Sequence, residues 1–289
     1  MRRSIAAIAG VIFLLCAGAV QADVTLGVMA NRGEEAATAE WAAFSKYLSA
    51  KIGQPVHLVA FPIERTFELV GNRGIDFVIT NPAQTAGLEE RFDAKPLATW
   101  SKDGETAFGG VIILNPKSGI AKAADIKGRK VVAYNTESAG AYIFQRYHML
   151  QAGVDVSKDV RIYFTRTQDD IVRAVRSGEM DVGFVRTGVL ESMVAAGRLK
   201  MSDVAVLDMV RDPGFAQART TPLYPDWFLT ASPGVDAALA AKVKAAALAV
   251  PKGSPAARAA GIDGFVEPLP RDKLVAMLKA LRLPPFNNR

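Results

Sequence analysis

The sequence contains a single cysteine, Cys16, which lies in an N-terminal segment with the features of a secretory leader. This segment has a basic start at Arg2-Arg3, an apolar stretch from Ile5 to Leu15 and small residues just before a cleavage point at Ala22. We therefore predict that residues 1–22 are a signal peptide and that the chain is exported. The exported chain would contain no cysteine, which excludes disulfide bonds and thiol chemistry from it.

Histidine is nearly as scarce as cysteine. The two histidines, His57 and His148, lie far apart and form no paired metal-binding pattern. The chain also lacks a Gly-x-Ser-x-Gly nucleophile elbow and the glycine-rich loops that bind nucleotides. The adjacent acids Asp169-Asp170 could attract a metal ion, but acids at a helix start more commonly cap the helix. We therefore predict no catalytic residue, no metal site and no cofactor.

Charge of one sign is not concentrated anywhere in the chain. The sequence has 35 basic and 29 acidic residues, a formal net charge of +6, and no block of lysine or arginine. This distribution does not support nucleic-acid binding, whereas a mild positive excess is compatible with a small anionic ligand. After the leader, no stretch is long and apolar enough to cross a membrane, so we expect a protein that is not membrane-embedded.

The chain does have a regular alternation of apolar strands and amphipathic helices. Val24 to Met29 is a predicted strand, and the following helix, from about Glu34 to Ile52, carries apolar residues every three or four positions. Further strands and helices follow at similar spacing, which is typical of βαβ units. The pattern predicts an α/β fold in which mostly parallel sheets are flanked by helices.

The alternation starts again after the turn-rich segment 115–119, which we interpret as the first crossing between two lobes. The segment Tyr224-Pro225-Asp226-Trp227 is interpreted as the return crossing. The predicted organisation places residues 23–111 and 224–289 in lobe one and residues 112–223 in lobe two. The ligand cleft is expected between the two lobes.

Polar residues follow several predicted strands at the point where each strand ends. In open α/β sheets, ligands bind beyond these carboxyl ends, where helix N-termini offer free N–H groups. Small residues near Ser138 allow a ligand to approach the backbone, and the Arg186 guanidinium supplies a fork of donors. These features predict a site for a small anion. The predicted ligand-binding residues are Asn31, Arg32, Thr80, Asn81, Tyr134, Thr136, Ser138, Ala139, Arg186, Thr187 and Tyr224.

These residues also have structural interpretations that the sequence leaves open. The hydroxyl and amide side chains that precede helices are the types that cap helices. Arg186 could form an ion pair with Glu191 or Glu137 instead of contacting a ligand. Tyr224 could pack in the core or at the hinge.

Several motifs resemble those of a known family, the PhnD-like phosphonate- and phosphite-binding periplasmic proteins, which have the two-lobed type II fold. The resemblance covers nearly the whole chain after the leader. A narrower similarity is to the sensory domains of tetrathionate-type sensor kinases. The motifs similar to the family are Gly74-Ile75-Asp76-Phe77, Thr80-Asn81-Pro82, Phe108-Gly109-Gly110-Val111-Ile112 and 125–131; those similar to the kinases are Thr80-Asn81-Pro82, 185–191 and Leu223-Tyr224-Pro225-Asp226-Trp227.

The resemblance implies a solute-binding protein in the periplasm whose cleft closes on a small ligand by hinge motion, and we expect it to be a monomer. The expected ligand is a phosphonate- or phosphite-like or sulfur oxyanion, or an organic anion. The expected partner is an ABC permease or, alternatively, a separate membrane histidine kinase, since we expect no kinase in this chain. A further alternative is an enzyme on the same fold, for which Glu137 is the one acid that we can nominate.

Overall fold

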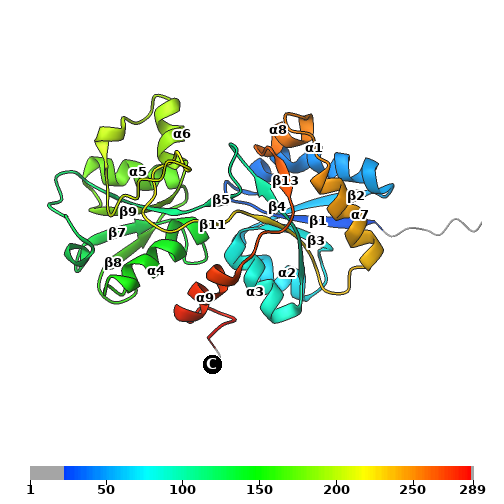
Figure 1. The fold of residues 1–289 in the computed structure, drawn as a ribbon, viewed down its shortest axis with the longest axis horizontal. Helices are drawn as coiled ribbons and strands as arrows, with labels where there is room; N and C mark the ends of the chain where they lie inside the picture. The colour runs from blue at the N-terminus through cyan, green and yellow to red at the C-terminus, as the bar shows by residue number, and fades with distance from the viewer. Residues whose placement is uncertain (1–22, 288–289) are drawn as a thin grey trace, which may run out of the picture.

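In the computed structural model, which describes residues 23–287, each half of the molecule is built around its own β-sheet (Figure 1). The predicted signal peptide, residues 1–22, lies outside the described residues. The predicted α/β fold with two lobes is confirmed. Both sheets are mixed, rather than mostly parallel, because several strand pairs run antiparallel.

The sheet of lobe one has six strands in the order β13-β4-β12-β3-β1-β2. Strand β1 pairs in parallel with β2 and β3, as expected for βαβ units. Strand β12 belongs to the returning segment and inserts antiparallel between β3 and β4, so the two segments of lobe one share a single sheet. The strands are β1 (Val24–Met29), β2 (Val56–Phe61), β3 (Phe77–Thr80), β4 (Lys95–Ser101), β12 (Phe228–Ala231) and β13 (Gly264–Val266).

The sheet of lobe two has five strands in the order β10-β6-β9-β7-β8. Strand β7 pairs in parallel with β8 and β9, and β6 pairs antiparallel with β9. The strands are β6 (Gly110–Leu114), β7 (Lys130–Ala133), β8 (Arg161–Phe164), β9 (Val182–Arg186) and β10 (Ala205–Val206).

The chain crosses between the lobes through two short strands, β5 (Ala107–Phe108) and β11 (Tyr224–Pro225), which pair antiparallel (Figure 1). We call this pair the hinge. Because β6 already belongs to the sheet of lobe two, the first crossing lies before Gly110. The turn-rich segment 115–119, which we interpreted as the first crossing, instead follows β6 inside lobe two.

Helices cover both sheets, and their ends follow local rules. Helix α1 buries Trp41, Phe44 and Leu48 on one face, and Gly53 ends it in the left-handed conformation with φ 73°. The helices of lobe one are α1 (Glu34–Ile52), η1 (Ile63–Arg65), α2 (Thr66–Gly71), α3 (Pro82–Phe92), α7 (Ala237–Leu248) and α8 (Pro255–Ala260). Those of lobe two are η2 (Ala123–Ile126), η3 (Ala139–Ile143), α4 (Phe144–Gln151), α5 (Gln168–Ser177), α6 (Val189–Ala195) and η4 (Met201–Asp203).

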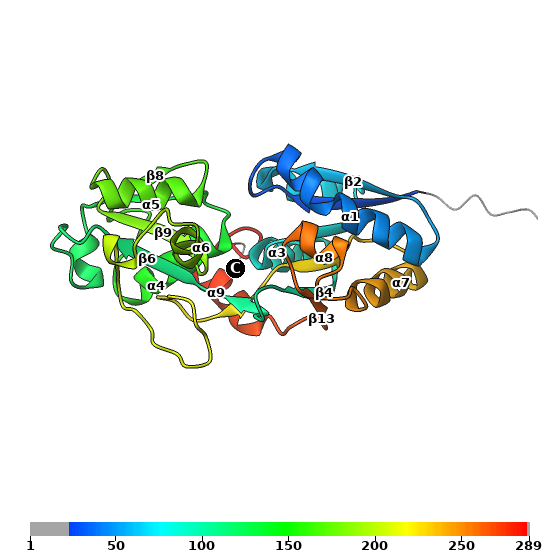
Figure 2. The ribbon, with the colours of Figure 1, turned by 90° about the horizontal axis from the view of Figure 1, so that it is seen from above.

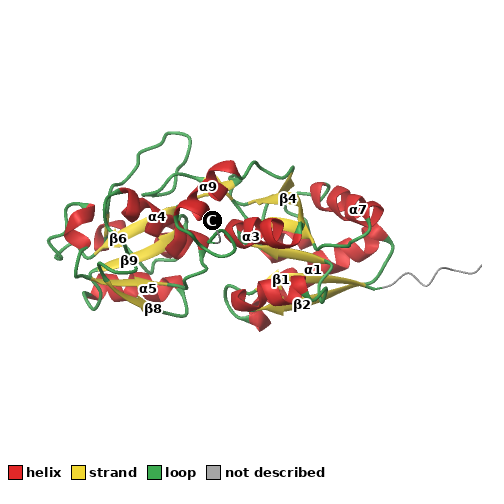
Figure 3. Ribbon diagram, turned by 90° about the horizontal axis from the view of Figure 1, so that it is seen from below, coloured by secondary structure: helices red, strands yellow, loops and turns green. Residues whose placement is uncertain are grey.

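The last helix, α9 (Asp272–Ala280), lies between the lobes on the hinge side (Figures 1 and 2). Its buried side chains Leu274 and Met277 belong to the same hydrophobic cluster as Phe108 and Tyr224 of the hinge and Phe144 of α4. Helix α9 also packs on α3 of lobe one (Figure 3). The returning segment therefore contributes to lobe one and also contacts lobe two. Within residues 23–287, no helix combines the length and apolar character that a membrane span requires.

Candidate functional site

A small cavity of about 30 Å³ lies between the lobes, at the carboxyl ends of β1, β3, β7 and β9. This is room for roughly two or three water molecules, or for one small ion, since a water needs about 10–15 Å³ on this measure. The cavity is lined by Met29, Asn31, Ile63, Asn81, Phe108, Tyr134, Ser138, Ala139, Gly140, Gln168, Arg186 and Trp227. Its walls therefore come from both lobes and from the hinge region.

Lobe two presents the start of a helix to this cavity. Ser138 precedes η3, which continues into α4, and its side chain makes no capping hydrogen bond. The first N–H groups of a helix have no acceptor inside the helix, so those of Ala139 and Gly140 are available to a ligand. A Cβ atom on Gly140 would lie 2.5 Å from Phe108 Cε2 and 2.9 Å from Arg186 Cβ. Glycine is therefore required for this close approach.

Arg186 ends β9 and reaches the same cavity. Its guanidinium lies over the Phe108 ring, 4.4 Å from the centroid, and Nη2 donates to Asp226 Oδ2 at 3.1 Å. Its backbone N–H donates to Gln168 Oε1 at 2.8 Å. Among the described residues, the guanidinium makes no other hydrogen bond, so its remaining N–H groups can serve a ligand.

Arg186 forms an ion pair, but with a different partner from the two that the sequence left open. The partner is Asp226, whose side chain is only 4% exposed, rather than Glu191 or Glu137. Glu191 instead accepts a hydrogen bond from the backbone N–H of Ala218. Asp226 lies between β11 and β12, so the pair joins lobe two to the segment that returns to lobe one.

Lobe one contributes Asn81, which precedes α3. Its Oδ1 accepts from the N–H groups of Ala83 at 2.9 Å and Gln84 at 3.0 Å, so it is a helix cap. Its Nδ2 points the other way and donates to Glu137 O at 3.4 Å and to Met29 Sδ at 3.7 Å. The capping interpretation and a place in the cavity wall therefore both apply to this residue.

Three predicted residues lie behind the cavity wall. Thr80 is buried, with Oγ1 donating to Met29 Sδ at 3.3 Å. Thr187 Oγ1 accepts from the N–H of Gly109 at 3.3 Å. Tyr224 packs on the ring of Phe144 in the core, and burial raises the pKa of Tyr224 to about 12.

Two other predicted residues lie outside the cavity on the solvent side. Arg32 is exposed and forms an ion pair with Glu40 at 3.5 Å. Thr136 is exposed in the turn before Ser138. Asn31, Asn81, Tyr134, Ser138, Ala139 and Arg186 lie in the wall, and their contact with a ligand stays a prediction.

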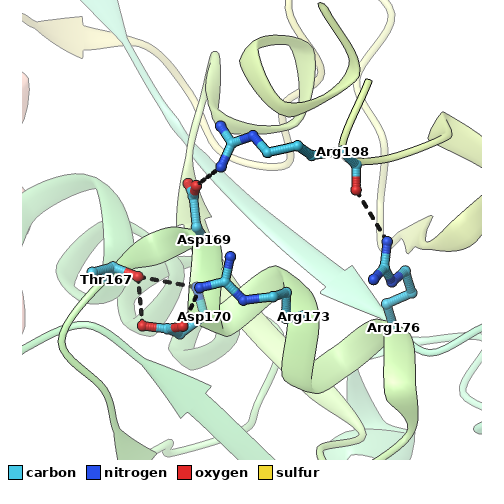
Figure 4. Close-up of polar contacts among 6 residues, drawn as sticks. All are labelled: Thr167, Asp169, Asp170, Arg173, Arg176 and Arg198. Atoms are coloured by element: carbon cyan, nitrogen blue, oxygen red, sulfur yellow. Dashed lines mark hydrogen bonds and ion pairs between the residues drawn. The ribbon is translucent and has the colours of Figure 1, made fainter. Parts of the chain in front are cut away.

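The acids Asp169 and Asp170 form ion pairs at the start of α5 (Figure 4). Thr167 caps this helix through the N–H of Asp170 at 3.1 Å, and Asp170 also pairs with Arg173. Asp169 pairs with Arg198. These contacts fix the helix whose first residue, Gln168, lines the cavity. The described residues contain no cluster of three or more metal-ligating side chains.

Lys102, which follows β4, is a cation that our sequence analysis missed. It makes no hydrogen bond through its side chain and no ion pair among the described residues. Burial lowers the pKa of Lys102, and the positive charge of Arg186 lowers it further, as does Arg32 to a smaller degree; Asp103 and Asp226 oppose the shift. Lys102 therefore lies within electrostatic reach of both Arg186 and Asp226.

The sequence analysis also missed several uncharged residues of the wall. Gln168 starts a helix just after a strand, so the rule that we applied to Ser138 could have found it. Gly140 carried no signal of its own, because its role comes from a contact with distant Phe108. The other residues missed are Met29, Ile63, Phe108 and Trp227.

Comparison with known proteins identifies the class. Residues 26–272 match the family described as "ABC transporter, phosphonate, periplasmic substrate-binding protein". The chain belongs to this family, whose members bind substrates in the periplasm. The predicted resemblance is thus confirmed.

Individual proteins of known name share less than a third of their aligned residues with this chain. The tetrathionate sensor histidine kinase TtrS of Salmonella typhimurium is 29% identical over 290 residues, which cover 98% of this chain and 48% of the kinase. The chain therefore spans about half the length of this curated relative. XAC2383 from Xanthomonas citri bound to ATP is 15% identical with a TM-score of 0.75, over 91% of this chain and 98% of that one. PhnD1 from Prochlorococcus marinus in complex with methylphosphonate is 15% identical with a TM-score of 0.73, over 90% and 98%. At such identities, the two structures show a shared fold.

Proposed function

We propose that this chain is a monomeric periplasmic receptor that captures a small oxyanion between its lobes and delivers it to an ABC permease. The observation that carries the proposal is the pairing of the uncapped helix start at Ser138 with the Arg186 guanidinium in one cavity. Backbone N–H groups and a guanidinium are the donors that oxyanions prefer in proteins.

The ligand class follows from the size and the lining of the cavity. A space of about 30 Å³ favours a compact phosphonate-, phosphite- or sulfur-based oxyanion over a larger organic anion. We also propose that the protein binds its ligand without converting it. Glu137, the acid that an enzyme would need, accepts a hydrogen bond from Gln84 at 2.8 Å and lies outside the cavity wall.

A thermal-shift screen with phosphite, methylphosphonate, thiosulfate, tetrathionate and acetate tests the ligand class. A ligand present at about 100 times its Kd adds about 2.7 kcal/mol, which raises the Tm by roughly 5–10 °C for a chain of this size. Calorimetry should then give one site per chain, and the recovered ligand should be unchanged. A screen in which no anion raises the Tm would contradict the oxyanion proposal, and a recovered product would favour an enzyme.

A second candidate partner is a membrane histidine kinase that recognises the loaded receptor. The identity to TtrS over 98% of this chain favours it. A strain that lacks the protein separates the two candidates. Loss of anion uptake supports the permease, whereas normal uptake with loss of anion-induced gene expression supports the kinase.

A further inference from the structure

The segment after β7, residues 134–137, contacts lobe one at several points; we call it the rim segment. Tyr134 Oη donates to the backbone oxygen of Asn31 at 3.0 Å. Asn135 Nδ2 donates to Glu64 Oε1 at 2.6 Å. These contacts reach the loop after β1 and the short helix η1, so the rim segment spans the edge of the cleft.

Glu137 makes two further contacts between the lobes. Its backbone oxygen accepts from Asn81 Nδ2 at 3.4 Å, and its carboxylate Oε2 accepts from Gln84 Nε2 at 2.8 Å. All of the donors and acceptors in these contacts belong to the protein itself. The closed arrangement therefore has its own hydrogen bonds, in addition to those that a bound anion would provide.

When the Glu137 carboxyl is ionised, its contact with Gln84 leaves the amide oxygen of Gln84 without a hydrogen-bond donor. Gln84 Oε1 is buried and has no hydrogen-bond donor among the described residues. An ionised carboxylate only accepts hydrogen bonds, whereas a protonated one also donates. A proton on Glu137 would thus give the amide oxygen a donor, and the two side chains would form a two-bonded acid–amide pair.

Closure also brings two carboxyl groups of the same sign together. Among residues 23–287, neither Glu64 of η1 nor Glu137 of the rim segment forms an ion pair with a basic side chain. The neighbouring Arg65 pairs with Glu68 instead. Burial raises the pKa of Glu137; the bond from Gln84 opposes this and the charge of Glu64 adds to it. Tyr134 is a further ionisable group in the rim segment. Burial raises the pKa of Tyr134 above its ordinary value, so the side chain stays neutral in neutral and acidic solution.

We propose that closure of the cleft takes up a proton at Glu137, beside the charge of Glu64, so that the closed form becomes more favourable as the pH falls. This proposal adds a pH dependence to the proposed function, and its biological meaning rests on that function. Without the contact to Gln84 and the neighbouring Glu64, as in an open form, we expect the Glu137 carboxyl to titrate near the ordinary glutamate value of about 4.3. The effect is complete below that value and is lost as the pH rises through the higher pKa of the closed form.

Ligand-free protein provides the direct test, because closure can be measured without knowing the ligand. The mature chain has no native cysteine, so spin labels can be placed at A50C on α1 and A195C on α6, both exposed. Pulsed paramagnetic resonance between about pH 4.5 and 7.5 should show the shorter distance gaining population in acid, by at most about tenfold per pH unit for one proton.

Two variants locate the effect. Glu137→Gln keeps an acceptor for Gln84 without the charge, and it should be closed to the same extent at every pH. Glu179→Gln, in the exposed turn before β9, is the matched control and should titrate like the wild type. Distances that do not change with pH, or a pH response that persists in Glu137→Gln, would overturn the proposal.

Titration with a ligand distinguishes a failure of this proposal from a failure of the proposed function. Thiosulfate keeps its charge over the tested range, so its affinity should rise in acid for the wild type and stay level for Glu137→Gln. If neither thiosulfate nor the other anions bind, the oxyanion proposal fails, and the ligand-free distances still decide whether closure takes up a proton.

Discussion

Arg186→Met combined with Asp226→Asn tests the contribution of the guanidinium to anion binding. Arg186→Ala alone would mix two effects, because it leaves the buried carboxylate of Asp226 without its cation. Removing one partner of a buried pair costs about 3–5 kcal/mol, and less here because the Arg186 side chain is 22% exposed. Asparagine at position 226 removes that charge and can still accept from the N–H of Trp227, which Asp226 Oδ1 does at 2.9 Å.

The expected loss of affinity follows from the donors that are removed. A hydrogen bond to a charged group contributes about 1.5–3 kcal/mol, so the double variant should bind the anion roughly 10- to 150-fold more weakly. Asp226→Asn alone should retain binding, because the guanidinium is then free to face the ligand.

Calorimetry with the best anion of the screen measures the affinity, and a melting curve shows that each variant is folded. Arg219→Met with Asp212→Asn removes a comparable pair, with an N–O distance of 2.8 Å, whose residues are not part of the cavity wall. This control should bind like the wild type. A folded double variant at positions 186 and 226 whose affinity is unchanged would refute a ligand role for Arg186.

Three further predictions concern other parts of the wall. Trp227 lines the cavity, so anion binding should change the intrinsic fluorescence, and Trp227→Phe should remove most of that change while calorimetry still detects binding. Gly140→Ala should lower stability by about 1–3 kcal/mol and weaken binding, since its Cβ would clash at 2.5 Å; Gly74→Ala, with its nearest contact at 3.5 Å, should do neither. Asn81→Ala and Ser254→Ala each remove a helix cap and should each cost about 1 kcal/mol, but only Asn81→Ala should reduce affinity. Melting curves and titrations of the same samples measure each difference. Equal affinities of Gly140→Ala and Gly74→Ala, or of Asn81→Ala and Ser254→Ala, would contradict the place of Gly140 or Asn81 in the binding site.

Local sequence signals predicted the elements of this fold well. The bounds of β1 and α1 agree with the prediction, because periodic apolar residues and a glycine stop mark them without reference to distant parts of the chain. The crossing between the lobes was placed too late, at 115–119. Turn-forming residues mark turns of every kind, and only the pairing of β6 with β9 shows to which lobe the strand belongs.

The same distinction separates the parts of the site that were predicted from those that were missed. Ser138 and Arg186 were predicted to line the cleft because one lies in the polar segment between a strand and a helix and the other at the end of a strand, which are local properties. The pairing of Arg186 with Asp226 spans 40 positions and depends on how the returning segment passes the hinge. Phe108 likewise faces the cavity only because β5 and β11 pair there. Such contacts are set by topology, which hydrophobic periodicity does not encode.

One buried amide sets the positions of the backbone around the cleft. Gln145 of α4 donates through Nε2 to the backbone oxygens of Gly140 at 2.7 Å and Val185 at 2.8 Å, and to that of Val111 at 3.4 Å. It therefore links η3, β9 and β6 from a position outside the cavity wall. Because all three acceptors are backbone oxygens, this link between the segments does not depend on the side chains that face the cavity.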